Sequence, residues 1–232
     1  GARQGRHKEL DRNVHLRKED MSKITIASPS WMRADTCSSH DYLPDLRYVV
    51  CSSQAEAYRE QGLPVWECPD SVQGNVSRVR NWILDSSPTD NTLILDDDFH
   101  YLGRWNGNRH VRMSTDEAME FIEQGFSLAE QFGVRFWGVN IIQDKGAYRE
   151  YTPFSLSCVV LGPFGGFIGP DCRYDELLPL KEDYDMSLQM LNKHRKILRI
   201  NFAHYVCKQH TNKGGCAGYR TVDRERQQFD DL

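Results

Sequence analysis

The stretch TLILDDDF, residues 92–99, places four strand-forming residues directly before three aspartates and a phenylalanine. Adjacent carboxylates repel one another, and burying a carboxylate without a partner is costly. A divalent cation would remove that cost, because hard oxygen ligands at the end of a strand suit Mg²⁺ or Mn²⁺. The ordinary alternative is a solvated acidic turn, but apolar residues flank the aspartates on both sides. We therefore expect a buried strand that ends in a metal site.

Strand and helix patterns alternate before this stretch. Residues 24–27, 46–51 and 64–67 have the composition of short strands, and residues 54–61 and 75–86 have helical spacing. Such alternation predicts an α/β fold with a parallel sheet and helices on its faces. Ligands of open α/β sheets bind outside the carboxyl ends of the strands, and the aspartates stand at such an end.

The chain after the aspartates is richer in strand patterns. Its clearest helix is expected at 114–132, because Ser114 and Glu117 have the spacing of a capping box. The other elements expected there are strands at 134–139, 156–161, 197–200 and 202–206 and a helix at 183–192. No repeat or linker interrupts residues 22–232, which predicts one domain preceded by a polar N-terminal extension at residues 1–21.

Composition and charge limit the function classes. The longest apolar runs are far too short to span a bilayer, and no charged-then-apolar leader opens the sequence, so neither a membrane span nor a secretory signal is expected. The net charge of −4 argues against a generic polyanion-binding surface, although a local basic groove is compatible with it. Seven cysteines at irregular spacings, without a CxxC pair, indicate reduced thiols and a cytoplasmic protein.

Residues 93–98 resemble the DxD segment of the GT-A glycosyltransferases, in which carboxylates hold Mn²⁺ or Mg²⁺ on the diphosphate of a nucleotide sugar. Residues 24–30 followed by Arg33 are similar to the first strand and nucleotide-cradling loop of that family, and residues 75–81 to the helix before the DxD strand. The resemblance covers about residues 22–218. It implies a GT-A fold, a Rossmann-like nucleotide-binding sheet flanked by helices with a smaller β-rich acceptor half.

The resemblance also implies a donor site for a UDP-sugar. Asp96 and Asp98 would bind the metal, Asp97 would contact the sugar or ribose, and Lys213 would neutralise charge on the leaving diphosphate. The alternative for each arginine is a surface salt bridge, and the alternative for the glycines is a tight hairpin. The residues assigned to the donor are Ser28, Arg33, Arg78, Arg80, Asp96, Asp97, Gly165, Gly166 and Lys213.

The catalytic base would lie at the start of the helix expected at 183–192. In inverting GT-A enzymes an acidic pair at this point of the chain supplies the base, which implies Asp183 as the base and Glu182 as its alternative. The ordinary explanation is helix capping, because the helix dipole stabilises carboxylates at a helix N-terminus.

His210 would complete the metal shell, as a histidine after the catalytic helix often does in GT-A enzymes. His204 is a lesser candidate for the metal because it lies inside a predicted strand. A rival hypothesis is a zinc site made by Cys207, His210 and Cys216, which lacks a fourth ligand nearby.

Residues 26–30 and 77–85, together with the aspartates, are most similar to the TET-associated glycosyltransferases. These are largely phage and bacterial enzymes that place sugars on hydroxymethylpyrimidines in DNA. The likeness implies a UDP-sugar donor and 5-hydroxymethylcytosine, or a related base in DNA, as the acceptor. It also implies the host-cell cytoplasm as the location if the protein is phage-encoded.

A basic, aromatic segment, residues 104–112, follows the aspartates. Arg104, Trp105 and Arg109 would contact the acceptor there, holding phosphate and stacking on a base, and the alternative is a solvated loop. Three other functions stay open: a GT-A enzyme acting on a protein or a glycan, a nucleotidyltransferase, or a binding module without activity. A nucleotidyltransferase usually has a glycine-rich basic loop directly after its first strand, and residues 28–33 do not resemble that loop.

Overall fold

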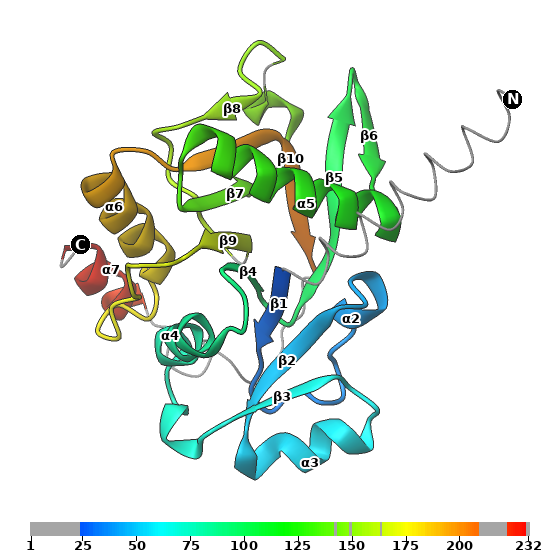
Figure 1. Cartoon of the computed structure of the whole chain (residues 1–232), viewed down its shortest axis with the longest axis vertical. Helices are drawn as coiled ribbons and strands as arrows, with labels where there is room; N and C mark the ends of the chain where they lie inside the picture. Colours follow the sequence, from blue (N-terminus) through cyan, green and yellow to red (C-terminus); the bar gives the residue numbers. More distant parts are fainter. Residues whose placement is uncertain (1–23, 142, 149, 163, 209–221, 231–232) are drawn as a thin grey trace, which may run out of the picture.

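The fold is built on one mixed sheet, as the computed structural model shows (Figure 1). The structure describes residues 24–141, 143–148, 150–162, 164–208 and 222–230. Ten strands of these described residues belong to the sheet. The predicted polar extension at residues 1–21 lies outside the described residues.

Four parallel strands make up the first half of the sheet. β1 (Ile24–Pro29) lies between β2 (Leu46–Cys51) and β4 (Asn91–Leu95), and β3 (Val65–Cys68) pairs with β2. Helical segments connect each of these strands to the next, as parallel neighbours require. The parallel α/β sheet predicted from the alternating patterns is therefore confirmed.

The crossovers of this half contain α2 (Ser39–Tyr42), α3 (Ser52–Glu60), the 3-10 helix η1 (Asp70–Val72) and α4 (Val76–Ser86). α3 begins two residues before the predicted range 54–61. α4 matches its prediction, because the side chain of Asn75 caps it by accepting a hydrogen bond from the backbone N–H of Ser77 at 2.9 Å.

The second half of the sheet joins strands that are far apart in the sequence. Its strands are β5 (Phe99–Asn106), β6 (Arg109–Arg112), β7 (Phe136–Asn140), β8 (Phe154–Ser155), β9 (Phe164–Ile168) and β10 (Leu198–Cys207). The strand order is β3-β2-β1-β4-β9-β7-β10-β5-β6, with β8 paired to β10. β9 is antiparallel to both of its neighbours, whereas β10 is parallel to β7 and antiparallel to β5.

The helices of this half are α5 (Thr115–Phe132), the 3-10 helix η2 (Lys145–Ala147), α6 (Glu182–His194) and α7 (Val222–Asp230). The predicted capping box starts α5: the Ser114 hydroxyl accepts from the backbone N–H of Glu117, whose carboxylate accepts from the backbone N–H of Ser114. Gly133 ends the helix in the left-handed conformation, with φ of 61°.

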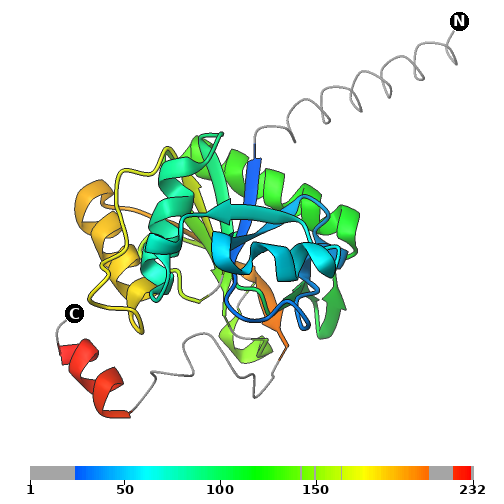
Figure 2. The ribbon, with the colours of Figure 1, turned by 90° about the horizontal axis from the view of Figure 1, so that it is seen from below.

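Alternation along the strands divides the core between the two faces of the sheet. Leu93 and Leu95 of β4 pack on one face with residues of α3 and α5, and Ile94 packs on the other face with residues of α4 and α6. Figure 2 shows α4 and α6 together on one side of the sheet and α5 on the other. The helices therefore flank the sheet as expected.

Residues 156–161 do not form the predicted strand. The hydroxyl of Ser187 in α6 accepts a hydrogen bond from the backbone N–H of Val160 at 3.1 Å and donates one to its carbonyl at 2.7 Å. A helix side chain thus supplies the bonds that a neighbouring strand would otherwise supply. The two strands predicted at 197–200 and 202–206 are instead one strand, β10, whose pairing with β7 shifts register between Ile200 and His204.

Residues 104–112 are a β-hairpin rather than a loop. β5 and β6 pair through a two-residue turn at Gly107 and Asn108, with Asn106 opposite Arg109. Gly107 has φ of 56°, a left-handed conformation that glycine adopts without strain.

Candidate active site

The three aspartates form the turn between β4 and β5, at the carboxyl end of β4. Asp97 is 7% exposed, and both of its carboxylate oxygens have partners. Ser30 donates its hydroxyl hydrogen to Oδ2 at 2.6 Å, and Nη1 of Arg33 lies 2.6 Å from Oδ1. Burial raises the pKa of the Asp97 carboxyl, and Ser30 and Arg33 counteract that rise. The structure therefore brings Arg33 and Asp97 together as partners of one another.

A chain of hydrogen bonds fixes the loop after β1 around this pair. The backbone N–H of Arg33 donates to the Tyr58 hydroxyl at 3.0 Å, and that hydroxyl lies 2.8 Å from the Ser30 hydroxyl, which in turn contacts Asp97. Sequence reasoning missed Ser30 and Tyr58. Tyr58 faces inward one helical turn after Ala55 in α3, a position that predicts core packing rather than a place in a polar network.

Asp98 lies beside a thiol at the end of β10. Its backbone carbonyl accepts from the N–H of Lys208 at 2.8 Å, and its side chain contacts that of Cys207. Burial, and then the negative charges of Asp96 and Asp97, raise the pKa of the Asp98 carboxyl to about 6. A carboxylate that is destabilised in this way by its neighbours is one that a divalent cation would stabilise. Asp96 and Asp98 therefore fit the ligand chemistry predicted for Mn²⁺ or Mg²⁺.

Arg80 of α4 links the aspartates to the start of α6. Its Nη2 lies 2.7 Å from Oδ1 of Asp96, and its Nη1 lies 2.9 Å from Oε1 of Glu182. The arginine is only 5% exposed, and its guanidinium lies over the Tyr174 ring at 5.5 Å. Arg80 was predicted to contact the donor. In the structure it contacts two carboxylates, one in the turn after β4 and one at the start of α6.

The acidic pair predicted to supply the base stands in the first turn of α6. Oδ2 of Asp183 accepts from the backbone N–H of Gly162 at 2.8 Å, and Oδ1 accepts from the N–H of Tyr184 at 2.8 Å. Burial raises the pKa of the Glu182 carboxyl, and the charge of Arg80 counteracts the rise. Asp183 is thus oriented by backbone donors, whereas Glu182 is paired with a cation.

Two other predicted donor residues are placed differently. Nε of Arg78 lies 2.9 Å from Oε2 of Glu176, and about two fifths of each side chain is exposed, which is the surface salt bridge given as the alternative. Ser28 is fully buried in β1, and its hydroxyl has no hydrogen-bond partner among the described residues. Its side chain is therefore closed to a donor in this structure.

Aromatic rings occupy the space over the two predicted donor glycines. A Cβ atom at Gly166 would stand 2.1 Å from Nε1 of Trp137, and one at Gly165 would stand 3.0 Å from Cε2 of Phe136. Both rings belong to the core of the sheet. Packing of aromatic side chains from β7 thus explains why β9 has glycine at these positions.

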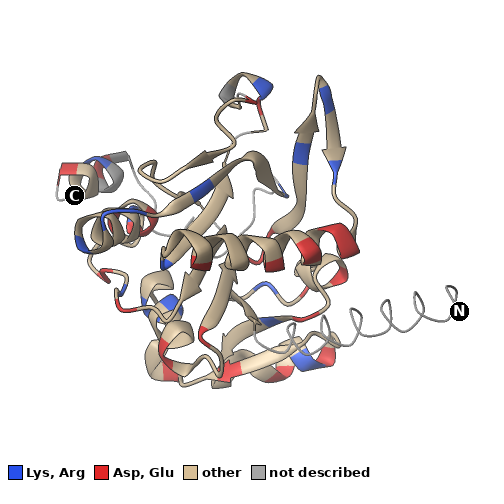
Figure 3. Ribbon diagram, turned by 45° about the horizontal axis from the view of Figure 1, so that its top comes forward, with Lys and Arg blue, Asp and Glu red and all other residues tan. Residues whose placement is uncertain are grey.

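The predicted acceptor residues lie far along the β5–β6 hairpin. A strand rises about 3.3 Å per residue, so Arg104 lies roughly 20 Å from Asp98 along β5. Arg104 is 3.0 Å from a carboxylate oxygen of Glu117, and the Trp105 ring packs 5.4 Å from that of His110. Figure 3 shows the basic residues of this hairpin, which include the exposed Arg109. Adjacency in the sequence therefore does not place these residues beside the aspartates.

Three of the predicted site residues lie outside the described residues: His210 of the metal shell, Lys213 of the donor site and Cys216 of the rival zinc site. His204 is described, and it lies within β10 with its Nε2 2.9 Å from Nε2 of His110. His204 is 1% exposed and faces the hairpin. Cys207 contacts Asp98, so the described member of the rival zinc set lies next to a predicted metal ligand.

Among the described residues, Asp171, Cys172 and His194 form the group whose possible metal-ligand atoms all lie within 4.8 Å of one another, and the three aspartates after β4 do not meet this criterion. Nε2 of His194 lies 2.8 Å from Oδ1 of Asp171, and Nζ of Lys193 lies 3.1 Å from Oδ2. Burial alone would raise the pKa of the Asp171 carboxyl, but the hydrogen bonds from His194 and Lys193 lower it to about 2. The lysine ammonium already provides positive charge at this carboxylate, so ion pairing accounts for the group.

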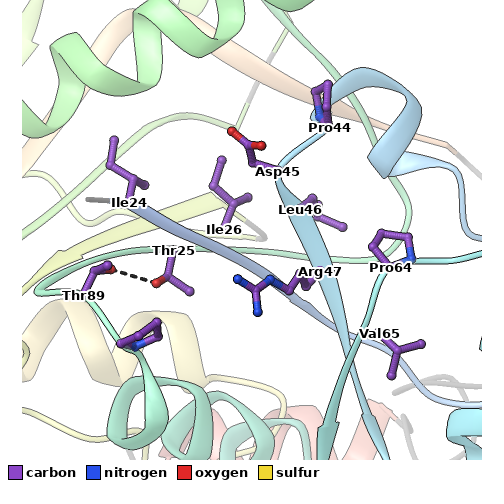
Figure 4. A pocket seen from close by; sticks show the side chains of 11 residues that line it. Ile24, Thr25, Ile26, Pro44, Asp45, Leu46, Arg47, Pro64, Val65 and Thr89 are labelled. Carbon is purple, nitrogen blue, oxygen red and sulfur yellow. Dashed lines mark hydrogen bonds between the residues drawn. The ribbon is translucent and has the colours of Figure 1, made fainter. Parts of the chain in front are cut away.

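A cleft of about 560 Å³ lies at the opposite edge of the parallel strands from the aspartates. Figure 4 shows its walls, which come from the amino ends of β1, β2 and β3 and include a 2.7 Å hydrogen bond between Thr25 and Thr89. Ligands of open α/β sheets bind at the carboxyl ends of the strands, so we place the candidate site at the aspartates and not in this cleft. In the described part of the chain, none of the helices combines the length and the apolarity needed to span a membrane.

Neither a protein-family model nor a curated protein matches the chain. Solved structures do match. Glucosyl-3-phosphoglycerate synthase from Mycobacterium tuberculosis, in complex with Mn²⁺, UDP-glucose and phosphoglyceric acid, aligns with a TM-score of 0.51 at 12% identity over 81% of this chain and 72% of that chain. The same enzyme in complex with Mg²⁺ and UDP aligns over 89% and 79%, again with a TM-score of 0.51 and 12% identity.

S. aureus TarS, residues 1–349, aligns with a TM-score of 0.51 at 14% identity over 79% of this chain. The chain spans 59% of that structure, so a large part of TarS has no counterpart in it. Likeness at such low identity concerns the arrangement of strands and helices. The chain has the GT-A fold of the glycosyltransferases to which it is similar.

Proposed function

We propose that this protein is a metal-dependent glycosyltransferase that transfers a sugar from a UDP-sugar to a hydroxyl group. The main support is the bridge made by Arg80, which joins a carboxylate at the carboxyl end of β4 to one at the start of α6. Acidic groups from two distant parts of the chain thereby meet at the edge of the sheet where ligands bind. The similar synthase was solved with Mn²⁺ and UDP-glucose in complex, which agrees with this donor class.

In this proposal Asp96 and Asp98 would hold Mn²⁺ or Mg²⁺, and the ion would supply positive charge to the donor diphosphate. Asp183 accepts the proton of the acceptor hydroxyl as that oxygen forms its bond to the anomeric carbon. The bond from that carbon to the diphosphate breaks, and UDP leaves. Attack from the face opposite the diphosphate inverts the anomeric centre. The backbone donors on Asp183 keep its carboxylate oriented for this proton transfer.

For the acceptor we propose a hydroxymethylpyrimidine in DNA, with 5-hydroxymethylcytosine as the first candidate. The support is the resemblance of residues 77–85 to DNA-modifying glycosyltransferases and the cationic, aromatic hairpin β5–β6. Trp105 and Arg109 of that hairpin are chemically suited to stacking and phosphate contact. A hydroxymethyl group lies in the major groove, and flipping the base out would bring it to the aspartates.

UDP release tests the reaction. The purified chain is incubated with Mn²⁺, a UDP-sugar and hydroxymethylated DNA, unmodified DNA or free saccharides, with Asp98→Asn and Asp183→Asn as variants. We expect release only with hydroxymethylated DNA, and a loss of about 10²-fold or more in each variant. Asp45→Asn is the matched control, because Asp45 is exposed in the cleft at the opposite edge.

The outcomes separate the two levels of the proposal. Transfer to a saccharide but not to modified DNA would exclude the DNA acceptor and leave a glycosyltransferase. Normal UDP release by both site variants would contradict the assignment of the site itself.

A further inference from the structure

Arg80 is a buried cation with two anionic partners on different elements. It lies on α4 and is 5% exposed, while Asp96 follows β4 and Glu182 begins α6. The two contacts use different nitrogens of one planar group, Nη2 toward Asp96 at 2.7 Å and Nη1 toward Glu182 at 2.9 Å. A guanidinium has the rigid, forked geometry that fixes two partners relative to each other.

The surroundings of Arg80 leave it little freedom. The Tyr174 ring lies 5.5 Å below the guanidinium carbon, and Nε is buried without a hydrogen-bond partner among the described residues. A buried donor without a hydrogen-bond partner costs free energy. The two carboxylate contacts therefore hold the Arg80 side chain in this buried position although its Nε loses hydration there. The other bridges to α4 differ, because Arg78–Glu176 and Arg173–Asp85 are exposed pairs with one carboxylate each.

The two anchored carboxylates differ in access. The side chain of Asp96 is 40% exposed, whereas that of Glu182 is 14% exposed. Arg80 holds Oδ1 of Asp96, so Oδ2 is the oxygen left for a metal ion. Glu182 is the residue before Asp183, and the same guanidinium thus fixes the start of the helix that presents the proposed base.

We propose that Arg80 is a positioning residue: it aims Asp96 at the metal and sets the place of Asp183 relative to it by holding Glu182. This inference rests on the proposed function. Groups that orient a metal ligand from outside the coordination shell typically contribute about 10- to 100-fold to metal affinity or activity. Glu182 is accordingly an anchor for α6 and not a second base.

Arg80→Lys tests the bridge, because lysine keeps the charge but offers one point contact in place of a fork. We measure Mn²⁺ binding in the presence of UDP by calorimetry, and kcat and KM for the UDP-sugar. We expect Mn²⁺ affinity to fall about 10-fold or more and kcat to fall about 100-fold. Arg173→Lys is the matched control, since Arg173 pairs with Asp85 on the same helix α4, and both quantities should keep their wild-type values.

Glu182→Gln extends the test to the far side of the bridge. Arg80 lies between Glu182 and Asp96, so a role of Glu182 limited to local packing would leave Mn²⁺ affinity unchanged. We expect it to weaken several-fold, and we expect the double variant to bind Mn²⁺ no more weakly than Arg80→Lys alone, because both changes break one unit. If Arg80→Lys does not fold, as a thermal melt would show, Glu182→Gln alone decides.

The results distinguish this inference from the function on which it rests. A wild-type protein without Mn²⁺-dependent UDP binding or sugar transfer would overturn the proposed function. An active wild type whose Arg80→Lys and Glu182→Gln variants both bind Mn²⁺ normally would overturn the positioning role alone.

Discussion

His204 and His110 face each other nitrogen to nitrogen, with their Nε2 atoms 2.9 Å apart and their rings stacked. A hydrogen bond at this distance needs one nitrogen with a proton and one without it, so a second proton would set two donors against each other. Burial, and then the charge of His110, lower the pKa of His204 to about 4. Between about pH 4 and 6.5 the folded protein therefore keeps His204 neutral, whereas a free histidine is protonated there.

This pair predicts a loss of stability in mild acid. The unfolded chain binds a proton at His204 near its ordinary pKa of about 6.5, and the folded chain binds it only near 4, so stability falls as the pH drops between these values. The full effect is about 3 kcal/mol. Urea unfolding of the wild type and of His204→Gln at about pH 7 and about pH 4.5 measures it, and the variant should lose much less stability on acidification.

His40→Gln provides the control, because His40 is half-buried beside Tyr48 and lies in a different part of the fold. It should keep the wild-type dependence on pH. A His204→Gln profile as steep as that of the wild type would show that other groups cause the acid sensitivity.

Individual site residues were predictable only where their chemistry depends on local sequence. The three aspartates after an apolar strand predict a metal site. Asp183 at the start of a helix predicts a carboxylate that accepts hydrogen bonds from backbone N–H groups. The partners of these residues were not predictable. Arg80 meets Glu182 across 102 positions of the chain, and no periodicity relates residues so far apart. The burial of Arg80 was predictable from helical spacing, because Arg80 lies on the same inward face of α4 as Ser77 and Leu84.

The elements formed from local patterns were predicted best. The helix at 114–132 has a capping box at its start and glycine at its end, and both signals are contained in the helix itself. Residues 156–161 have the same apolar character as a strand, but Ser187 of a distant helix satisfies the backbone there. The sequence also contains a signal for the β5–β6 hairpin, namely a Gly-Asn pair between two runs of strand-forming residues.

The hairpin predicts how the protein binds nucleic acid if DNA is its acceptor. Arg109 is exposed near the turn, so Arg109→Gln should weaken DNA binding in all sequences and reduce the salt dependence of the binding constant by roughly one phosphate contact. Arg104→Gln should have a smaller effect, because Arg104 already pairs with Glu117 at 3.0 Å. Fluorescence anisotropy with labelled DNA over a salt series measures both.

Arg59→Gln is the control for this comparison, since Arg59 of α3 pairs with Glu67 of β3, away from the hairpin. An equal loss of DNA affinity in all three variants would indicate attraction to net charge alone. No loss in Arg109→Gln would remove the hairpin from the acceptor site.

The whole molecule should become more stable when donor and metal bind together. Two of the predicted metal ligands, Asp96 and Asp98, come from the turn after β4, at the junction of the two halves of the sheet. Unfolding disrupts the arrangement of these carboxylates, so a ligand that binds only the folded state adds about 2.7 kcal/mol at 100 times its dissociation constant. Thermal melts should rise with UDP and Mn²⁺ together, and much less with either alone.

Asp98→Asn should abolish this rise, because it removes a proposed metal ligand. Without metal at neutral pH, the same variant should be at least as stable to heat as the wild type. The native Asp98 carboxyl has a raised pKa of about 6, so its ionisation at neutral pH opposes folding. A rise of the melting temperature in Asp98→Asn as large as in the wild type would remove Asp98 from the metal site.

The position of β10 has a consequence for how this protein folds during its synthesis. β10 ends at Cys207, yet it lies inside the sheet between β7 and β5, which precede it in the chain. On the ribosome, one edge of each of these strands stays unpaired until β10 has been synthesised. The backbone groups of an unpaired edge can form hydrogen bonds with strands of other nascent chains. At typical rates of translation the interval from Asn140 to Cys207 lasts roughly 3 to 13 seconds. During that time β6 and β9 cover the other edges of β5 and β7, so the two edges that β10 will later cover are the ones exposed to chaperones or to other chains.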